Sequence, residues 1–196
     1  MLNDVKLWDD FRANKEYALS QIYINNVELL FSYGGKYTND EEILKDTIQE
    51  LFFDLIRTRE HLGPTDNIRF YLIKSFKRKL LRELGSRKKM SSLEDSNIRD
   101  DITSDNLAGV NHSSIEEDLI SNEISSCKKE LILKALDKLS PRLQEILFYR
   151  YTCDFKYDQI CDIMLIEYDS ARKMIFRAIK SLKEYVHESD YIFHEH

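Results

Sequence analysis

The sequence predicts an all-α fold of two small helical domains joined by a flexible acidic linker. Its 196 residues include only 5 Gly and 2 Pro, fewer turn residues than an all-β fold needs. Apolar residues recur at helical spacing in residues 8–84 and again in residues 128–186. The stretch between them is rich in Ser, Asn and Asp and has no aromatic residue from Ser91 to Asn122.

The net charge of −6 is concentrated in that middle stretch. Residues 1–90 carry a net charge of +2, residues 91–126 carry −8, and residues 127–196 carry 0. Residues 91–126 cannot bury enough apolar surface to offset the entropy of ordering. We therefore predict a linker between two domains, since the alternative, a surface loop of that length, is uncommon in compact domains. An acidic total would argue against nucleic-acid binding only if the charge were evenly spread.

Three helical patterns predict a helix bundle over residues 1–90. The first, over residues 8–33, is broken near Gly34. The second begins at Asn39 or Asp40, either of which can cap it, and is closed by Gly63 and Pro64. The third covers residues 67–84. The apolar positions of the three patterns are Phe11, Tyr17, Ile22, Ile24, Val27, Leu30 and Phe31; Ile43, Leu44, Ile48, Leu51, Phe52, Leu55 and Ile56; and Ile68, Tyr71, Leu72, Phe76, Leu80, Leu81 and Leu84.

The third pattern is unusually basic. Residues 74–89 contain eight Lys or Arg side chains and one acid, Glu83, and aromatic residues occur at Phe70, Tyr71 and Phe76. Cations for phosphates and rings for stacked bases are typical of a nucleic-acid platform. The alternative is an ordinary solvated basic face.

Residues 127–196 predict a helix-turn-helix. An amphipathic segment, Lys128–Leu139, precedes Ser140 and Pro141, a helix-start signal for a helix over about 141–151. A short helix, Tyr157–Met164, and a turn over Leu165–Tyr168 lead into a longer helix, Asp169–Tyr185. Its buried stripe is predicted at Ala171, Ile175, Ala178, Leu182 and Tyr185 or Val186, and its opposite face at Arg172, Lys173, Phe176, Arg177 and Lys180. In this motif the second helix enters the major groove of DNA.

Cysteine and histidine usage predicts no cofactor and no metal site. Cys127, Cys153 and Cys161 are odd in number and lack metal-ligand spacing, as expected of reduced thiols in a cytoplasmic protein. The histidines near the end, His187, His194 and His196, fit a polar terminus. The start of the chain does not have the pattern of a signal peptide, and no stretch is apolar enough to predict membrane insertion.

The second domain contains residues at a recognisable spacing, namely Leu139, Pro141, Arg142, Gln144, Glu145, Tyr157, Ile160, Arg177, Ala178 and Leu182. They match a Leu-x-Pro-Arg-x-Arg/Gln-Glu start, then Tyr-x-x-Ile-Ala, then a helix ending near Arg-Ala-x-x-x-Leu. This pattern resembles region 4 of bacterial RNA polymerase sigma factors of the extracytoplasmic-function class, in which the last helix is the recognition helix. The first domain resembles region 2, since Asp46-x-x-Gln49-Glu50-x-Phe52 is similar to the acidic helix that docks on core polymerase.

The resemblance implies three sets of site residues. A core-polymerase surface would meet the β′ clamp helices through Asp46, Gln49, Glu50 and Asp54, while the second domain would meet the β flap. The loop His61–Asn67 and the helix from Ile68 would handle the melted −10 element, with Arg69, Tyr71, Lys74, Lys77 and Arg78 as candidates. The −35 element would be read by Arg172, Lys173, Phe176 and Arg177.

The sequence also departs from the family. Leu165 stands where many members have Gly in the helix-turn-helix turn, and Arg78 replaces an Asn that often reads a base. Glu167 and Asp169 place acids at the start of the recognition helix, where they favour the helix dipole but repel phosphates. The −10 preference of the family therefore does not transfer to this chain.

The mechanism that the resemblance implies is not catalysis by this chain, which is predicted to be no enzyme and to have no catalytic residue. Core polymerase would carry out the chemistry, and this protein would supply promoter specificity and trap melted bases. The acidic linker would thread the polymerase near the active-site cleft and discourage DNA binding by the protein alone. The family commonly has an anti-sigma partner.

Three other readings remain. A stand-alone helix-turn-helix regulator would bind duplex DNA as a dimer, but no heptad seam is visible. An all-helical metal-dependent hydrolase would need His and acidic ligands converging from several helices. A protein-binding adaptor would explain the amphipathic helices but not the two separate basic ones.

Overall fold

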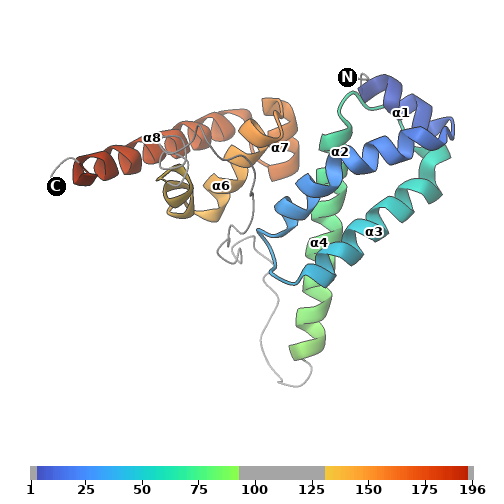
Figure 1. Cartoon of the computed structure of the whole chain (residues 1–196), viewed down its shortest axis with the longest axis horizontal. Coiled ribbons are helices and arrows are strands. Elements are labelled where there is room, and N and C mark those ends of the chain that lie inside the picture. Colours follow the sequence, from blue (N-terminus) through green and yellow to red (C-terminus); the bar gives the residue numbers. More distant parts are fainter. Residues whose placement is uncertain (1–3, 93–130, 194–196) are drawn as a thin grey trace, which may run out of the picture. The chain divides into compact units, whose positions relative to one another are not determined.

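The computed structural model describes residues 4–92 and 131–193, which form helices and turns with no strand among them (Figure 1). This confirms the predicted all-α class. The chain divides into two compact units, residues 1–108 and 109–196. The predicted acidic linker, residues 91–126, overlaps the described residues only at positions 91 and 92, and the rest of it lies outside them. The predicted domain limits stay predictions.

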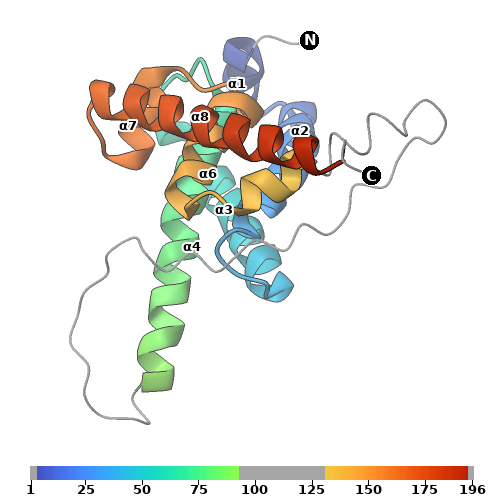
Figure 2. The ribbon, with the colours of Figure 1, turned by 90° about the vertical axis from the view of Figure 1, so that its left-hand side faces the viewer.

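The first unit is a bundle in which the last helix packs across the two before it. Helix α4 contacts α2 and α3, and its final turns extend beyond them (Figures 1 and 2). The elements in order are α1 (Asp4–Arg12), α2 (Glu16–Gly34), α3 (Glu41–Thr58), the short 3-10 helix η1 (Arg59–His61) and α4 (Ile68–Ser92).

The core of this unit is aromatic and aliphatic and draws on all four α-helices. The core is closely packed at Gly34, because a Cβ atom there would lie 2.5 Å from Leu44 Cδ2 and 3.0 Å from Phe76 Cζ. The largest side chains with under 2% exposure in this unit are Trp8, Ile22, Leu30, Tyr33, Leu44, Leu55, Leu72, Ile73, Phe76 and Leu80.

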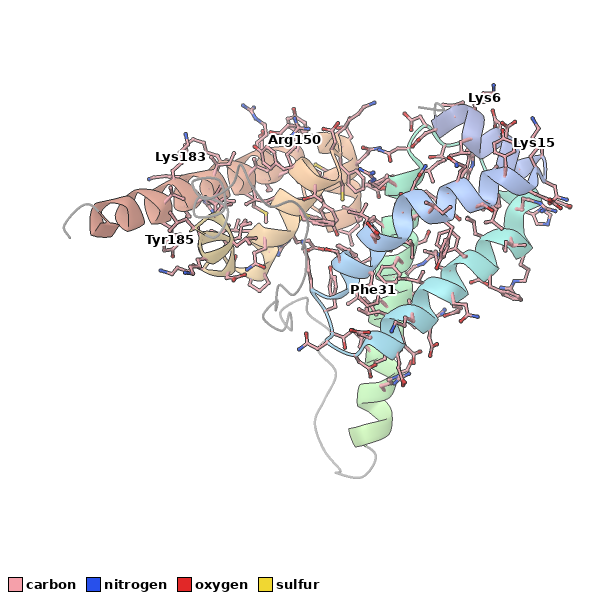
Figure 3. All side chains as sticks on the ribbon, viewed as in Figure 1. Lys6, Lys15, Phe31, Arg150, Lys183 and Tyr185 are labelled. Carbon is pink, nitrogen blue, oxygen red and sulfur yellow. The ribbon has the colours of Figure 1, made fainter. Side chains whose placement is uncertain are left out.

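The predicted helical stretch over residues 8–33 is not one helix, because the chain turns between α1 and α2. Asn14 adopts φ 62°, in the left-handed region that Asn tolerates better than most residues. Asp10 is 7% exposed and holds the junction, since its carboxylate accepts hydrogen bonds from Lys15 Nζ at 2.6 Å and from the Tyr17 hydroxyl. Lys15 lies at this end of α2 (Figure 3).

The two later helices begin at well-defined caps. Asp40 Oδ1 accepts from the backbone N–H groups of Glu42 and Ile43 at 3.0 and 3.1 Å, which confirms Asp40 as a cap of α3. Helix α4 is capped from a distance, because Asp4 Oδ2 of α1 accepts from Ile68 N at 3.0 Å. Trp8 Nε1 also donates to the Gly63 carbonyl at 2.8 Å. Helix α1 therefore fixes the loop before α4.

One predicted helix limit was wrong, and the helical patterns extend beyond the core. Helix α4 continues to Ser92 rather than ending at residue 84, because residues 85–92 add helical turns beyond the apolar pattern. Four apolar residues of the predicted helical patterns are exposed, because helical periodicity does not show where a neighbouring helix stops covering the face: Tyr17, Ile24, Ile56 and Leu81.

The second unit is a set of short helices packed on one long helix. Helix α6 (Pro141–Leu147) runs into a π-helical turn, η2 (Phe148–Thr152), followed by α7 (Tyr157–Met164) and α8 (Tyr168–Phe193). Residues 131–137 are helical, within the predicted Lys128–Leu139 segment, whose first three residues lie outside the described ones. The predicted helix over 141–151 is α-helical only to Leu147, and α8 starts one residue before the predicted Asp169.

Long helix α8 packs its apolar side on both α6 and α7. Leu139, Leu147 and Ala178 form a buried cluster against which Leu182 and Tyr185 pack. Tyr185 points toward the helical segment of residues 131–137, whereas Lys183 points away from it (Figure 3). Just after that segment, Lys138 Nζ lies 5.0 Å from the Tyr185 ring centroid.

The junction of α1 and α2 predicts an acid sensitivity. Hydrogen bonds from Lys15 and then Tyr17 hold the pKa of Asp10 below its ordinary value. The associated stability is present above the unfolded pKa of about 3.9 and is lost as the pH falls through the lower folded pKa. We expect the free energy of unfolding to fall more steeply from about pH 5 to pH 2 in the wild type than in Asp10→Asn.

Urea unfolding across that pH range tests this prediction. The matched control is Asp9→Asn, which removes the neighbouring exposed carboxylate. The same flattening of the pH profile in both variants would contradict the assignment to Asp10.

Candidate functional site

The four predicted core-polymerase residues lie along one side of α3, and we call Asp46, Gln49, Glu50 and Asp54 the acidic stripe. The first three are exposed and Asp54 is half-buried. The opposite side of α3 carries the buried residues Leu44, Ile48, Leu51 and Leu55. The structure thus brings the stripe together as one surface.

Two cations of α4 contact this stripe. Lys79 Nζ lies 2.8 Å from Glu50 Oε1 and 2.5 Å from Asp54 Oδ2, and Arg82 Nη2 lies 3.3 Å from the same Glu50 oxygen. Burial lowers the pKa of Lys79, but hydrogen bonds to Asp54 and Glu50 outweigh it and raise that pKa above its ordinary value. The same bond from Lys79 lowers the pKa of Asp54.

These contacts change the interpretation of the basic helix. Of the eight cations in residues 74–89, Lys79 and Arg82 face the acids of α3, and Arg87 pairs with Glu83 at 2.9 Å. Sequence reasoning missed the pairing of Lys79 because its partners are 25 and 29 residues away in sequence. Nothing in the residues next to Lys79 in the sequence indicates that it is buried against Glu50 and Asp54.

The predicted −10 residues lie on the first turns of α4. Lys74 and Arg78 are exposed and one helical turn apart, while Arg69 and Lys77 are half-buried. Lys74 Nζ lies 5.7 Å from the Phe70 ring centroid. Tyr71 packs against Trp8, with ring centroids 5.0 Å apart, and is half-buried. Four cations and one partly covered ring therefore share this region.

The loop His61–Asn67 before α4 is held at several points. Asn67 Oδ1 accepts from Phe70 N at 2.9 Å, and Thr65 Oγ1 accepts from Asn67 N at 3.2 Å. With the bonds from α1 described above, these contacts fix the loop relative to α4. His61, Gly63, Pro64 and Asp66 remain exposed on it.

The second unit has the predicted helix-turn-helix, formed by α7, a turn and α8. Ala171, Ile175 and Ala178 are buried under α6 and α7. The four predicted −35 residues, Arg172, Lys173, Phe176 and Arg177, are all exposed on α8, and Phe176 is 70% exposed. An exposed aromatic among cations gives this face both apolar and charged contacts.

The turn has a left-handed residue, Leu165, at the position where many members of the resembled family have Gly. Leu165 adopts φ 53° and ψ 50°, and the backbone N–H of Ile166 donates to the Cys161 carbonyl at 3.1 Å. The turn therefore keeps the geometry that Gly favours while holding a Leu that is 88% exposed. Rings of Tyr157 and Tyr168 flank it, with centroids 5.2 Å apart.

An apolar groove between α2 and α3 was missed from the sequence. Its volume is about 330 Å³, and Leu19, Ser20, Tyr23, Ile24, Phe52 and Ile56 line it. Tyr23 and Phe52 touch, with ring centroids 5.0 Å apart. One sequence signal could have indicated this groove. Apolar residues are spread around α2 more widely than a helix with a single buried side requires.

Two classes of feature are not found in the described part of the chain. No group of three or more His, Cys, Asp or Glu side chains comes together there as metal ligands would. No helix of residues 4–92 and 131–193 is long and apolar enough to cross a membrane.

Comparisons with known proteins point to one family for the second unit. Residues 129–182 match the family described as Sigma-70, region 4, a range that includes α6, α7 and the exposed face of α8. No curated protein matches the sequence.

Two solved structures share the fold of most of the chain. The first is a co-crystal structure of the sigma factor RpoE in complex with the anti-sigma factor NepR from Bartonella quintana, with a TM-score of 0.56, 14% identity, and coverage of 85% of this chain and 95% of that chain. The second is a structure of CnrH in complex with the cytosolic domain of CnrY, with a TM-score of 0.56, 11% identity, and coverage of 95% and 98%.

The left-handed Leu165 generates a stability prediction. We expect Leu165→Gly to raise the free energy of unfolding by about 1 kcal/mol, because Gly adopts a positive φ without the Cβ clash. Little burial is lost, since the side chain is 88% exposed. Leu165→Ala keeps the Cβ atom and is the control without gain. Equal urea midpoints for the Gly and Ala variants would contradict the backbone strain inferred at Leu165.

Proposed function

We propose that the protein is an alternative sigma factor of the extracytoplasmic-function class, which binds core RNA polymerase and directs it to promoters. The observation that carries this proposal is the match of residues 129–182 to Sigma-70, region 4, on a helix-turn-helix whose second helix has its candidate DNA-reading residues exposed. The fold shared with the sigma factor RpoE agrees with it.

Within this proposal the second unit reads the −35 element. Helix α8 enters the major groove, where Arg172, Lys173 and Arg177 contact phosphates or guanine edges. Phe176 supplies an apolar contact, for which the methyl group of thymine is the natural partner in that groove. The same unit meets the β flap of the polymerase.

The first unit docks on core polymerase and handles the −10 element. The acidic stripe suits a basic coiled coil such as the β′ clamp helices, because complementary charge steers association. The loop His61–Asn67 and the residues Arg69, Tyr71, Lys74, Lys77 and Arg78 capture unpaired bases and hold phosphates. Capture of melted bases favours open over closed DNA.

A partner that blocks these surfaces is part of the proposal. Both structures that share the fold are complexes, one with an anti-sigma factor and the other with the cytosolic domain of CnrY. We propose an anti-sigma partner for this chain as well. The acidic residues 91–126 would thread the polymerase near the active-site cleft and discourage DNA binding by the protein alone.

Core-polymerase binding is the first test. The purified protein is expected to co-purify with core RNA polymerase and to support run-off transcription from fork-junction DNA. Asp46→Lys should weaken the association about tenfold or more, since it places a cation opposite a basic partner. Glu28→Lys makes the same charge change at an exposed residue of α2 outside the stripe and is the matched control.

Two outcomes would count against the proposal. Failure of the wild type to bind the core would overturn it. Tight binding of promoter duplex without polymerase would favour instead a stand-alone helix-turn-helix regulator.

The contact of Phe176 is tested by removing one methyl group from DNA. We expect replacement of one thymine by uracil in the −35 element to weaken holoenzyme binding about fourfold, the effect of one buried methyl group. The Phe176→Ala protein should bind both duplexes equally. Tyr151→Ala, at an aromatic residue that is 63% exposed and outside α8, should keep the fourfold difference. Persistence of that difference in Phe176→Ala would contradict the contact.

A further inference from the structure

The two cations of α4 contact the acidic stripe in different ways. The Lys79 side chain is 10% exposed and bridges two carboxylates, Glu50 and Asp54. The Arg82 side chain is 69% exposed and makes one longer contact, to Glu50 alone. One cation is thus enclosed by the protein, and the other is largely in water.

These environments determine which cation can leave. Release of Lys79 would strand a poorly solvated charge and remove a bond from each of two carboxylates. Arg82 is solvated whether or not it touches Glu50, and exposed pairs of this kind contribute little. A cation from another molecule can therefore replace Arg82 but not Lys79.

The oxygen atoms of the two acids show what each cation occupies. Lys79 contacts Glu50 Oε1 and Asp54 Oδ2, so it holds both carboxylates from the α4 side. Arg82 contacts the same Glu50 oxygen. Lys79 sets where the carboxylates lie, whereas Arg82 takes up acceptor capacity of Glu50 that another donor could use.

An exposed aromatic residue on the same helix points to a protein as the partner. Phe53, between Glu50 and Asp54 in sequence, is 65% exposed. Exposed aromatic side chains are enriched at protein–protein contacts, where charged neighbours form the rim. The matching surface would be a helix that presents Lys or Arg beside an apolar residue.

We propose that Arg82 is an internal competitor that a basic partner displaces from Glu50, while Lys79 is a positioning residue that stays and holds Glu50 and Asp54 for docking. The identity of the partner as core polymerase rests on the proposed function. The exchange at Glu50 is a property of this chain and can be tested without polymerase.

The proposal predicts opposite effects on binding for Arg82→Gln and Lys79→Gln, two variants with the same change in net charge. Arg82→Gln frees Glu50, so it should tighten binding of a cationic partner about two- to fivefold at low salt, the range expected for one exposed pair. Lys79→Gln should weaken binding about threefold or more, because both carboxylates lose their fixed positions. A dependence on charge alone would instead tighten binding in both.

Lys45→Gln is the matched control for Arg82→Gln. Lys45 is 65% exposed and pairs with Glu41 of the same helix at 2.9 Å, so this variant also removes one exposed cation and frees one acid. It does not free an acid of the stripe. Binding in Lys45→Gln should therefore stay within a factor of about 1.5 of the wild type.

The first experiment uses decalysine as the cationic probe and the full chain as the protein. Affinity is read by NMR from the side-chain carboxyl carbon of Glu50, which reports binding at the stripe itself rather than at the acidic residues 91–126. Tightening in Arg82→Gln but not in Lys45→Gln supports the competitor role. Equal affinities in Arg82→Gln and the wild type would overturn it.

The same titration of the wild type tests Lys79 without a variant that could fail to fold. We expect the guanidinium signal of Arg82 to shift toward that of a free arginine as decalysine binds, and the ammonium signal of Lys79 to stay in place. Release of Lys79 into solvent, or retention of Arg82 on Glu50 at saturation, would overturn the proposal.

A second titration uses core RNA polymerase and the same variants, with Lys79→Arg as the conservative change that keeps a cation. Opposite effects of Arg82→Gln and Lys79→Gln, with recovery in Lys79→Arg, would support the positioning role in docking. If the wild type does not bind polymerase, the proposed function fails while the decalysine result still decides the exchange at Glu50.

Discussion

The first unit depends on the close approach of three helices at Gly34. A Cβ atom there would lie 2.5 Å from Leu44 Cδ2 of α3 and 3.0 Å from Phe76 Cζ of α4, so a side chain would force one of these buried residues to shift. Phe76 is fully buried in the space that results. Its position sets the rotation of α4, and Lys79, three residues later, is then directed at α3. The direction of Lys79 toward the acidic stripe is thus tied to the packing of Phe76 beside Gly34, the last residue of α2.

That geometry alters what the charges of the first unit can do. A count of residues suggests an acidic helix and a separate basic helix, each available to a partner. In the folded unit the two helices partly neutralise each other through Lys79, Arg82, Glu50 and Asp54. The free charge of the stripe is therefore smaller than its sequence implies, which weakens its nonspecific attraction to cations. In the proposed docking, the choice of partner would then depend more on shape and on the exposed Phe53.

Local signals in the sequence predicted the helices well, but they could not predict the contacts between helices. Asp40 as a cap, the bounds of α7 and the buried set Ala171, Ile175 and Ala178 depend on residues within a few positions of one another. The pairing of Lys79 with Glu50, and the cap that Asp4 gives to α4, join residues 29 and 64 positions apart. No periodicity records such contacts. The exposure of the candidate DNA residues on α8 could be predicted, but their roles rest on the family resemblance.

The cations of α8 also bear on the DNA contact proposed for the second unit. Among the described residues no acid forms an ion pair with Arg172, Lys173 or Arg177, whereas Lys180 lies 3.7 Å from Glu184. Each phosphate contact steepens the dependence of log affinity on log salt by about 0.9, so three cations give a slope of only about −3. Within the proposed function, such a unit would bind duplex DNA weakly by itself. Attachment to a larger assembly that holds the same DNA raises its effective concentration and removes that limit. The modest charge of α8 therefore fits a subunit that reads DNA from within a polymerase better than a regulator that must find its site alone.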